Sequence, residues 1–376
     1  MQIRNGIVLN GSNNRFERID LRIENGKIYQ FGVFPVDAGD YDAEGYYIIP
    51  GFIDTHIHGC VGVEFASEDE SFDRARRWLA SEGVTSFAAT VRALPPERVL
   101  AAERNIVRES QKKSNGAKLC GINLEGPFVS LSKSGVMNPP DIECNPSDAV
   151  KFAEEAKGLL KIMTLAPERE NATETILAAL KNGVNISLGH SEATYSEAMA
   201  AIDCGASRAT HVFNAMRSFS HRETGILGAV LNDERVNCEM ICDFVHLDPT
   251  TVMLVYKLKG AKNITLVSDT GFMSGLGDGE YVVDGRKRIV QNGVCRNPEG
   301  RIAGSCVSML AGARNLLSLG IPLEEISVMA SLNPARALGI DVETGLIREG
   351  KYADLIVCDK NLNIKAVFVN GVLQDE

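Results

Sequence analysis

The histidines of this chain are the residues best suited to chemistry, because five of the six follow short apolar segments. Two acids occupy the same kind of position, so the set comprises His56, His58, His190, His211, His246, Glu125 and Asp269. His56 and His58 are two residues apart, so on a strand both imidazoles point to one face and can reach a single cation. Taken singly, each residue fits an ordinary buried histidine or a capping acid. Together they predict a divalent metal site.

Such a site has a defined chemistry. A divalent metal bound by imidazoles and a carboxylate lowers the pKa of a bound water to ~7. A further carboxylate must accept the water's proton and pass it to the leaving group. Asp269 is suited to that role because it comes from a later strand. The set therefore predicts metal-assisted hydrolysis of an amide or related bond, and its ligands suit zinc, iron and manganese alike.

The elements that position these residues alternate between strand and helix. Eight apolar runs read as strands, at 52–53, 85–89, 119–124, 160–165, 184–188, 208–213, 238–245 and 264–267. Helical patterns lie between most of them, at 73–81, 97–111, 173–180 and 196–202. This alternation predicts a parallel (β/α)8 barrel, whose chemistry lies at the carboxyl ends of the strands. An open doubly wound sheet is disfavoured because the first strand lacks a Gly-x-Gly-x-x-Gly turn.

The two ends of the chain have a different, β-rich texture with Asn-Gly turns. We expect residues 1–50 and 344–376 to form one small β-sandwich domain, and residues 51–343 to form the catalytic barrel. A Gly-rich stretch after the eighth strand predicts a β-hairpin insertion near 277–300. Helices at 307–317 and 323–330 are expected to complete the barrel.

Composition excludes several classes of partner. The 376 residues include 39 Lys+Arg and 49 Asp+Glu, a formal charge of −10. This balance argues against nucleic acid and anionic membranes, both of which favour basic surfaces. Nine dispersed cysteines without a Cys-x-x-Cys pair are typical of reduced thiols. With no apolar run of signal-peptide or membrane-spanning length, the chain is expected to be cytoplasmic.

Several blocks resemble a known family. The segment 50–59 (PGFIDTHIHG) resembles the first-strand signature of the amidohydrolase superfamily, as does the stretch 345–355 (GLIREGKYADL). Within that superfamily, five blocks resemble the N-acetylglucosamine-6-phosphate deacetylases: 124–128 (LEGPF), 188–191 (LGHS), 210–216 (THVFNAM), 266–269 (LVSD) and 331–335 (SLNPA). The match runs over nearly the whole chain in the family's order.

The resemblance implies a role for each metal-site residue. Glu125, His190 and His211 match the main metal ligands, Asp269 matches the catalytic acid/base, and the His56–His58 pair is available for a second ion. One or two divalent ions are therefore expected. The implied reaction hydrolyses the N-acetyl group of N-acetyl-D-glucosamine 6-phosphate to D-glucosamine 6-phosphate and acetate. The alternatives are the same reaction on N-acetylgalactosamine 6-phosphate and a non-catalytic sugar-phosphate-binding barrel.

The superfamily branches that bridge two metals with a carboxylated lysine are disfavoured. That lysine would end the fourth strand, which here ends Thr164-Leu165-Ala166-Pro167. Lys161 lies at the other end of the same run.

The resemblance also implies contacts with the substrate. The matching positions are Asn214, Ala215, Arg222, His246, Ile302, Ala303 and Gly304. Arg222 is the natural phosphate clamp, because a guanidinium grips phosphate bidentately; without the family context it would pair with Glu223. In the family, the positions of Arg222 and His246 serve a site at a dimer interface, which implies a homodimer.

One loop departs from the family pattern. Where many members have histidine in Gly-x-His-Asn-Pro, this chain has Met137, preceded by Val136. The family histidine is thought to hydrogen-bond the acetyl carbonyl, whereas a thioether cannot donate a hydrogen bond. Either a metal polarises the carbonyl here, or the acyl group or sugar differs from the usual one.

Overall fold

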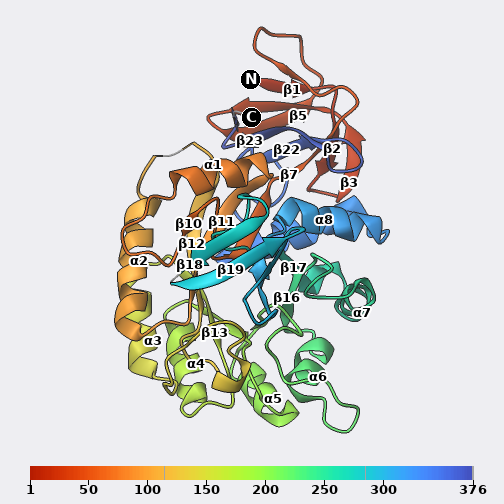
Figure 1. Ribbon diagram of the computed structural model, residues 1–376. Helices are drawn as coiled ribbons and strands as arrows, with labels where there is room; N and C mark the ends of the chain where they lie inside the picture. The colour runs from red at the N-terminus through yellow and green to blue at the C-terminus, as the bar shows by residue number, and fades with distance from the viewer. Residues whose placement is uncertain (114, 284, 375–376) are drawn as a thin grey trace.

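The computed structural model describes residues 1–113, 115–283 and 285–374 and shows a large barrel with a smaller group of sheets at one end (Figure 1). Both chain termini lie in the smaller group. The predicted fold class is confirmed, since an eight-stranded parallel sheet is accompanied by separate sheets. The domain boundaries at residues 50 and 344 stay a prediction. Residues 114, 284 and 375–376 of the predicted ranges lie outside the described residues.

The barrel consists of eight parallel strands whose spatial order follows the sequence. They are β8 (Phe52–Ile57), β11 (Val84–Arg92), β12 (Lys118–Glu125), β13 (Leu160–Leu165), β14 (Asn185–Leu188), β15 (Arg208–Ala209), β16 (Asn237–Ile241) and β17 (Ile264–Val267). Most of their residues are buried, as expected for a parallel sheet covered by helices. The Asp269 N–H donates to the His56 carbonyl at 2.9 Å, which joins the last strand to the first.

Helices cover the outside of this ring (Figure 1). They are α1 (Asp73–Ser81), α2 (Pro96–Ser110), α3 (Pro146–Glu155), α4 (Ala172–Lys181), α5 (Tyr195–Asp203), α6 (Gly225–Asn232), α7 (Pro249–Lys259), α8 (Met309–Ser318), α9 (Leu323–Ser327) and α10 (Asn333–Leu338). Asn145 and Asp248 accept hydrogen bonds from the first turns of α3 and α7, and a proline follows each of them. Such caps fix where these helices begin. No helix of the described ranges is both long and apolar enough to cross a membrane.

Two predicted strands are shorter than expected. The runs 208–213 and 238–245 were expected to be strands, but β15 ends at Ala209 and β16 ends at Ile241. The backbone φ is +28° at His211, +75° at Phe213 and +61° at Phe244. A left-handed residue cannot continue a β-ladder, so these apolar segments turn over the barrel mouth instead. The predicted ends of these two strands are wrong because a run of buried residues can form a turn as well as a strand.

The smaller sheets combine both ends of the chain. One contains β5 (Lys27–Gly32), β4 (Asp20–Glu24), β1 (Gln2–Arg4) and β6 (Tyr41–Asp42). The other contains β24 (Val372–Leu373), β23 (Ile364–Val369), β22 (Leu355–Cys358), β7 (Tyr47–Pro50), β2 (Ile7–Asn10) and β3 (Arg15–Arg18). Leu355 pairs with Pro50, two residues before β8 begins, so this sheet adjoins the first barrel strand. A separate apolar core that includes Leu21, Ile48 and Phe368 lies among these strands.

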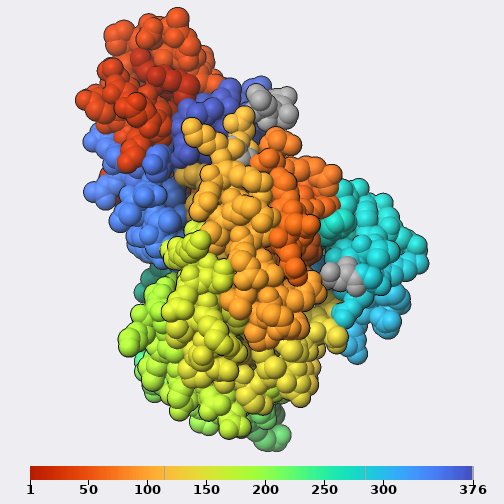
Figure 2. All heavy atoms as spheres, turned by 90° about the vertical axis from the view of Figure 1, so that its left-hand side faces the viewer, coloured from red at the N-terminus to blue at the C-terminus, as the bar shows by residue number. Residues whose placement is uncertain are grey.

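The predicted insertion after the last barrel strand is larger than a hairpin. It is a four-stranded antiparallel sheet of β18 (Gly279–Val283), β19 (Arg286–Gln291), β20 (Val294–Arg296) and β21 (Ile302–Ser305). Its last strand lies wholly beyond the expected limit of residue 300. Figure 2 shows this part of the chain, in cyan, as a lobe at one side of the barrel. A smaller hairpin, β9 (Gly59–Cys60) with β10 (Val63–Glu64), follows β8.

One buried acid of α2 lacks the partners that burial normally requires. Glu103 is fully buried, and neither carboxylate oxygen has a hydrogen-bond partner among the described residues. Burial raises its pKa to about 9, and the nearby charge of Glu155 acts in the same direction. The folded protein therefore keeps the Glu103 proton at a pH where an unfolded chain has lost it.

We expect Glu103 to make the protein less stable as pH rises. Between about pH 4.5 and 9 the unfolded chain binds fewer protons at this residue than the folded protein, so its contribution to the free energy of unfolding falls with pH. In the Glu103→Gln variant, the free energy of unfolding should fall by roughly 1–3 kcal/mol less than in the wild type over this pH range. Urea unfolding at several pH values measures the effect. The control Glu154→Gln, on the exposed face of α3, should follow the wild type; a Glu103 variant with the same pH profile would contradict the prediction.

Candidate metal centre and active site

The strand ends deliver the predicted ligands to one end of the barrel. His56 lies in β8 and Glu125 is the last residue of β12. His190, His211 and Asp269 each follow a strand by two residues. Their φ values are +50°, +28° and +50°, a region that residues other than glycine seldom adopt. Backbone strain of this kind clusters at functional sites, where the surrounding structure maintains it.

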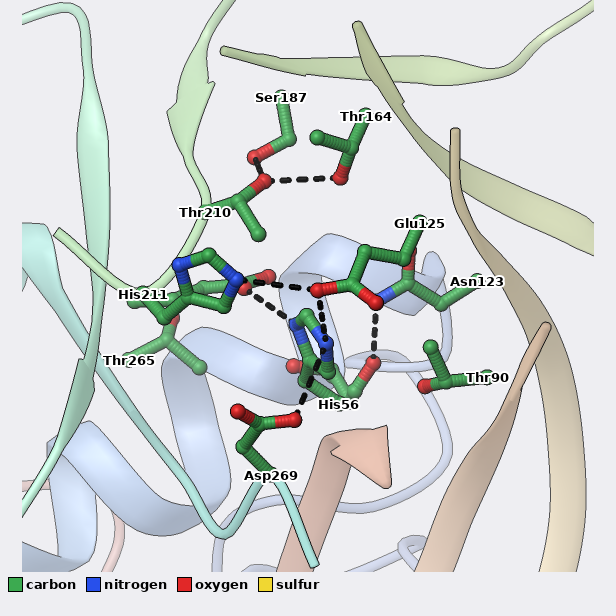
Figure 3. A network of polar contacts seen from close by, with 12 residues as sticks. His56, Thr90, Asn123, Glu125, Thr164, Ser187, Thr210, His211, Thr265 and Asp269 are labelled. Carbon is green, nitrogen blue, oxygen red and sulfur yellow. Dashed lines mark hydrogen bonds and ion pairs between the residues drawn. The ribbon is translucent and has the colours of Figure 1, made fainter. Parts of the chain in front are cut away.

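The side chains meet around the Glu125 carboxylate. Its Oε1 lies 2.9 Å from His190 Nε2 and 3.0 Å from His211 Nε2. The same oxygen is 3.5 Å from His56 Nε2, and Oε2 is 3.3 Å from His58 Nε2. Asp269 Oδ1 faces this cluster at 3.3 Å from His58 Nε2 and 3.6 Å from His56 Nε2. Figure 3 shows Glu125, His56, His211 and Asp269 pointing toward one another.

The arrangement of nitrogen atoms fits a metal ion better than a set of hydrogen bonds. The Nε2 atoms of His190 and His211 face each other at 3.1 Å, and a hydrogen bond between them can use only one proton. The buried Nε2 of His56 has no hydrogen-bond partner among the described residues. Two groups of ligand atoms lie within 4.8 Å of one another: His56, Glu125 and His211, and His56, His58 and Asp269. These donor sets suit one or two divalent cations.

Outer contacts orient two of the imidazoles. His56 Nδ1 lies 3.0 Å from Glu239 Oε2, and His190 Nδ1 lies 2.7 Å from the Lys133 carbonyl. Because each acceptor takes the Nδ1 proton, Nε2 is directed at the centre, where the neutral ring can offer its lone pair to a metal ion. Glu239 is itself held by Arg208 at 3.2 Å, and both are buried. Such outer partners are a regular feature of metal-binding histidines.

The electrostatics of the cluster keep Asp269 ionised. Burial by itself would raise the pKa of this carboxyl. The hydrogen bond from His58 and the charges of His56 and His58 outweigh burial and lower the pKa to about 2. The pKa of Glu125 lies well below its usual value although burial opposes this, because His190 and His58 act on it. Both acids are therefore acceptors at neutral pH, as a ligand and a general base require.

A cavity of about 690 Å³ opens above the centre. Among the predicted residues, those that line it are His58, Glu125, Val136, Met137, His190, His211, Asn214, Ala215, His246, Asp269, Ile302, Ala303 and Gly304. His56 is fully buried and does not itself line the cavity. Arg222 is exposed and does not line the cavity of its own chain. Glu223 pairs with Arg217 and not with Arg222.

Sequence reasoning missed two acids that act on the histidines. Glu239 lies within an apolar strand, and nothing in its spacing points to His56. Asp243 precedes His246 by three residues and is 2.7 Å from its Nδ1, an i, i+3 spacing that could have been noticed. Burial opposes the positive charge of His246, but the Asp243 contact raises its pKa above the ordinary value. Lys161 is the second residue of β13, at the end opposite the metal centre, as expected.

The barrel and its histidine–carboxylate centre define a metal-dependent hydrolase, and the chain belongs to the amidohydrolase family, whose model matches residues 47–373. It is 34% identical over 366 residues to the N-acetylglucosamine-6-phosphate deacetylase of Lysinibacillus sphaericus, covering 96% of this chain and 94% of that one. It is also 34% identical over 357 residues to the N-acetylgalactosamine-6-phosphate deacetylase of Escherichia coli O157:H7, covering 94% of both.

Solved structures agree with these similarities. The N-acetyl-D-glucosamine-6-phosphate deacetylase of Mycobacterium smegmatis superposes with a TM-score of 0.90 at 32% identity, covering 99% of both chains. A mutant of that enzyme, in complex with N-acetyl-D-glucosamine-6-phosphate, superposes with the same score at 31% identity and covers 100% of this chain and 99% of that one.

We expect Glu239 to determine how well the His56 side of the centre binds metal. Glu239→Gln weakens the acceptor that fixes the His56 tautomer, so metal affinity should fall roughly 10-fold or more. Metal content after equilibration in metal-buffered solution measures this. Glu234→Gln, an exposed acid near the start of the same strand, is the control. Unchanged metal affinity in a folded Glu239→Gln protein would contradict the prediction.

Proposed function

We propose that this protein hydrolyses the N-acetyl group of N-acetyl-D-glucosamine 6-phosphate, giving D-glucosamine 6-phosphate and acetate. The observation that carries the proposal is the convergence of His56, His58, His190, His211 and Glu125 on one point, with an ionised Asp269 beside them at the floor of an open cavity. The relatives named above, and the M. smegmatis complex with this sugar phosphate, supply the substrate.

Glu125, His190 and His211 would hold one divalent ion, and His56 and His58 would hold a second. An ion bound there supplies Lewis acidity, which polarises the acetyl carbonyl and lowers the pKa of water. Zinc, iron and manganese all suit these ligands. The chain's own contribution is to orient the imidazoles of His56 and His190 through Glu239 and the Lys133 carbonyl.

Asp269 moves the proton. Its side chain is 14% exposed toward the cavity, and Oδ1 lies 3.3 Å from His58 Nε2. Positive charge beside it holds the pKa of the Asp269 carboxyl below its usual value, so the carboxylate is ionised before the reaction and can take a proton from the attacking water. It then gives this proton to the sugar nitrogen as the C–N bond breaks, and the amino sugar phosphate and acetate are released.

The remaining lining residues would position the sugar phosphate. Asn214 and Ala215 follow His211 closely in the chain, and the segment 302–304 lines the same cavity. His246, held by Asp243, offers a partly positive imidazole to an anionic group. Met137 occupies the loop position where many family members use a histidine, so polarisation of the carbonyl falls to the metal or the acyl group differs.

We also propose a homodimer with Arg222 at its interface. Arg222 lies on an exposed segment, close to Phe219, whose side chain is 54% exposed. An arginine outside its own cavity can reach the phosphate site of a second copy, as the family resemblance implies. The protein is proposed to act in the cytoplasm, where reduced thiols persist, since all nine cysteines are free.

N-acetylgalactosamine 6-phosphate is the second candidate substrate. The E. coli O157:H7 relative that carries this name is as similar in sequence, at 34% identity, as the glucosamine enzyme from L. sphaericus. The two sugars differ in the configuration of one hydroxyl group.

Replacing the proton carrier should remove activity without removing the site. We expect Asp269→Asn to lower kcat by at least about 10²–10⁴-fold, the usual contribution of general acid–base catalysis. Acetate release and calorimetric binding of D-glucosamine 6-phosphate measure the two effects separately. Exposed Asp278→Asn is the matched control. A variant at Asp269 that retains most of the wild-type kcat would exclude this residue as the proton carrier.

A direct comparison of the two epimers tests the substrate. We expect acetate release from N-acetylglucosamine 6-phosphate with the higher kcat/KM, and loss of this activity when a chelator removes the metal. Restoration by added zinc, iron or manganese is the control for irreversible damage. A higher kcat/KM for the galacto epimer would reassign the substrate, and activity that survives complete metal removal would refute the mechanism.

A further inference from the structure

The inserted sheet presents two arginines to the same cavity as the metal centre. Arg286 and Arg288 are two residues apart on β19, so their side chains share one face of the strand. Both line the cavity. Val290 continues this face and packs into a small apolar core with Met273 and Ala303. The inner face of the insertion is therefore apolar near the barrel and cationic toward its tip.

The opposite face of the strand behaves differently. Lys287 does not line the cavity, and its Nζ lies 2.8 Å from Glu280 Oε1 on β18. Both side chains are exposed, and so is Arg286, so the two faces differ in lining the cavity and in ion pairing and not in exposure alone. The alternation Arg-Lys-Arg thus separates one paired outer cation from two inner cations.

The inner arginines have no acidic partner within ion-pair distance among the described residues. Arg286 Nη1 donates to the Val136 carbonyl at 3.2 Å, and Arg288 Nη1 donates to the Lys287 carbonyl at 3.3 Å. The acids of the cavity are engaged elsewhere: Glu64 pairs with Arg92 at 2.9 Å, and Glu125 and Asp269 face the histidines. Two guanidinium groups therefore add positive charge to a cavity whose carboxylates already have partners.

The surroundings favour an oxyanion as the missing partner. Arginine presents a planar set of donors that matches phosphate and carboxylate, and the residues lining this cavity include arginines but no lysine. Arg286 contacts the loop that carries Met137, which stands where many family members have a histidine. This loop therefore lacks the histidine hydrogen-bond donor, while the arginines of the insertion are donors in the same wall. Arg222 does not line the cavity of its own chain.

We propose that Arg286 and Arg288 form an oxyanion subsite in the wall of the cavity and bind an anionic group of the substrate. The inference deepens the proposed function and rests on it for the identity of the sugar. The oxyanion has two sources, the 6-phosphate itself or a carboxylate on a larger N-acetylated sugar phosphate. With either anion, the insertion would contribute directly to the selection of the substrate.

The test uses the metal-loaded protein and the variants Arg286→Met and Arg288→Met, with Lys287→Met as the control on the opposite face. If the 6-phosphate is the bound anion, we expect KM for N-acetylglucosamine 6-phosphate to rise roughly 10-fold in an inner-face variant, with kcat little changed, because a charge-assisted contact is lost. Lys287→Met should match the wild type. Arg288→Lys should restore only part of the loss, because it returns the charge without the planar donors.

Two further substrates identify the source of the anion. If the phosphate is bound, KM for unphosphorylated N-acetylglucosamine should not change in the variants. If a carboxylate is bound, the loss should appear only with N-acetylmuramic acid 6-phosphate, which carries one. The proposal is overturned if the double variant Arg286→Met/Arg288→Met matches Lys287→Met with all three compounds.

A binding measurement separates this proposal from the proposed function. Calorimetric titration with D-glucosamine 6-phosphate, muramic acid 6-phosphate and inorganic phosphate requires no turnover. If wild-type protein releases no acetate, the proposed function fails, while weaker anion binding by the variants would still establish the subsite. If acetate is released and the double variant binds every anion as the wild type does, only the subsite fails.

Discussion

The Glu125 carboxylate is the group on which the arrangement of the site depends. It is almost fully buried, and imidazoles from three other strand ends face its two oxygens at 2.9–3.5 Å. A carboxylate taken out of water without partners would be expensive, and so would four clustered imidazoles that were charged. The cost of burying the carboxylate and the cost of burying the imidazoles offset each other only if all the strand ends reach the same point. The closure of the barrel is therefore a condition for the chemistry.

The chain meets this condition partly through strain. His190, His211 and Asp269 have positive φ values, each costing on the order of 1–3 kcal/mol when the residue is not glycine. Hydrogen bonds in the barrel interior hold the strands beneath them. Thr210 Oγ1 lies 2.6 Å from Ser187 Oγ and 2.8 Å from Thr164 Oγ1, which ties β13 and β14 to the turn that carries His211 (Figure 3). The Asp269 N–H bonded to the His56 carbonyl fixes the turn after β17 in the same way.

The fold class and the central cluster were predictable because both follow from local order along the chain. Parallel strands must end at one rim, so histidines that end successive apolar runs must meet there. The ends of β15 and β16 were not predictable, since Val212 and Phe213 are as apolar as a strand requires while the backbone turns through left-handed conformations. The contact of Glu239 with His56 spans 183 residues, and no local pattern encodes it. The arginines of β19 carry no local signal that separates them from the solvated charges of a hairpin, and only the fold brings them to the cavity.

The net charge of −10 and an anionic substrate are compatible because electrostatic selection here is local. At physiological salt, charges more than ~8 Å apart across solvent are largely screened, so the acidic outer surface has little effect inside the cavity. Inside the cavity, the balance of positive and negative charge is set by contacts at hydrogen-bond distance. Glu64 is engaged by Arg92, and Asp243 by His246, so neither acts as an unpaired negative charge against a bound anion. Arg286 and Arg288, which have only carbonyl partners among the described residues, add positive charge to the cavity wall. An insertion at the rim can in this way change which anion is bound without disturbing the barrel that performs the hydrolysis.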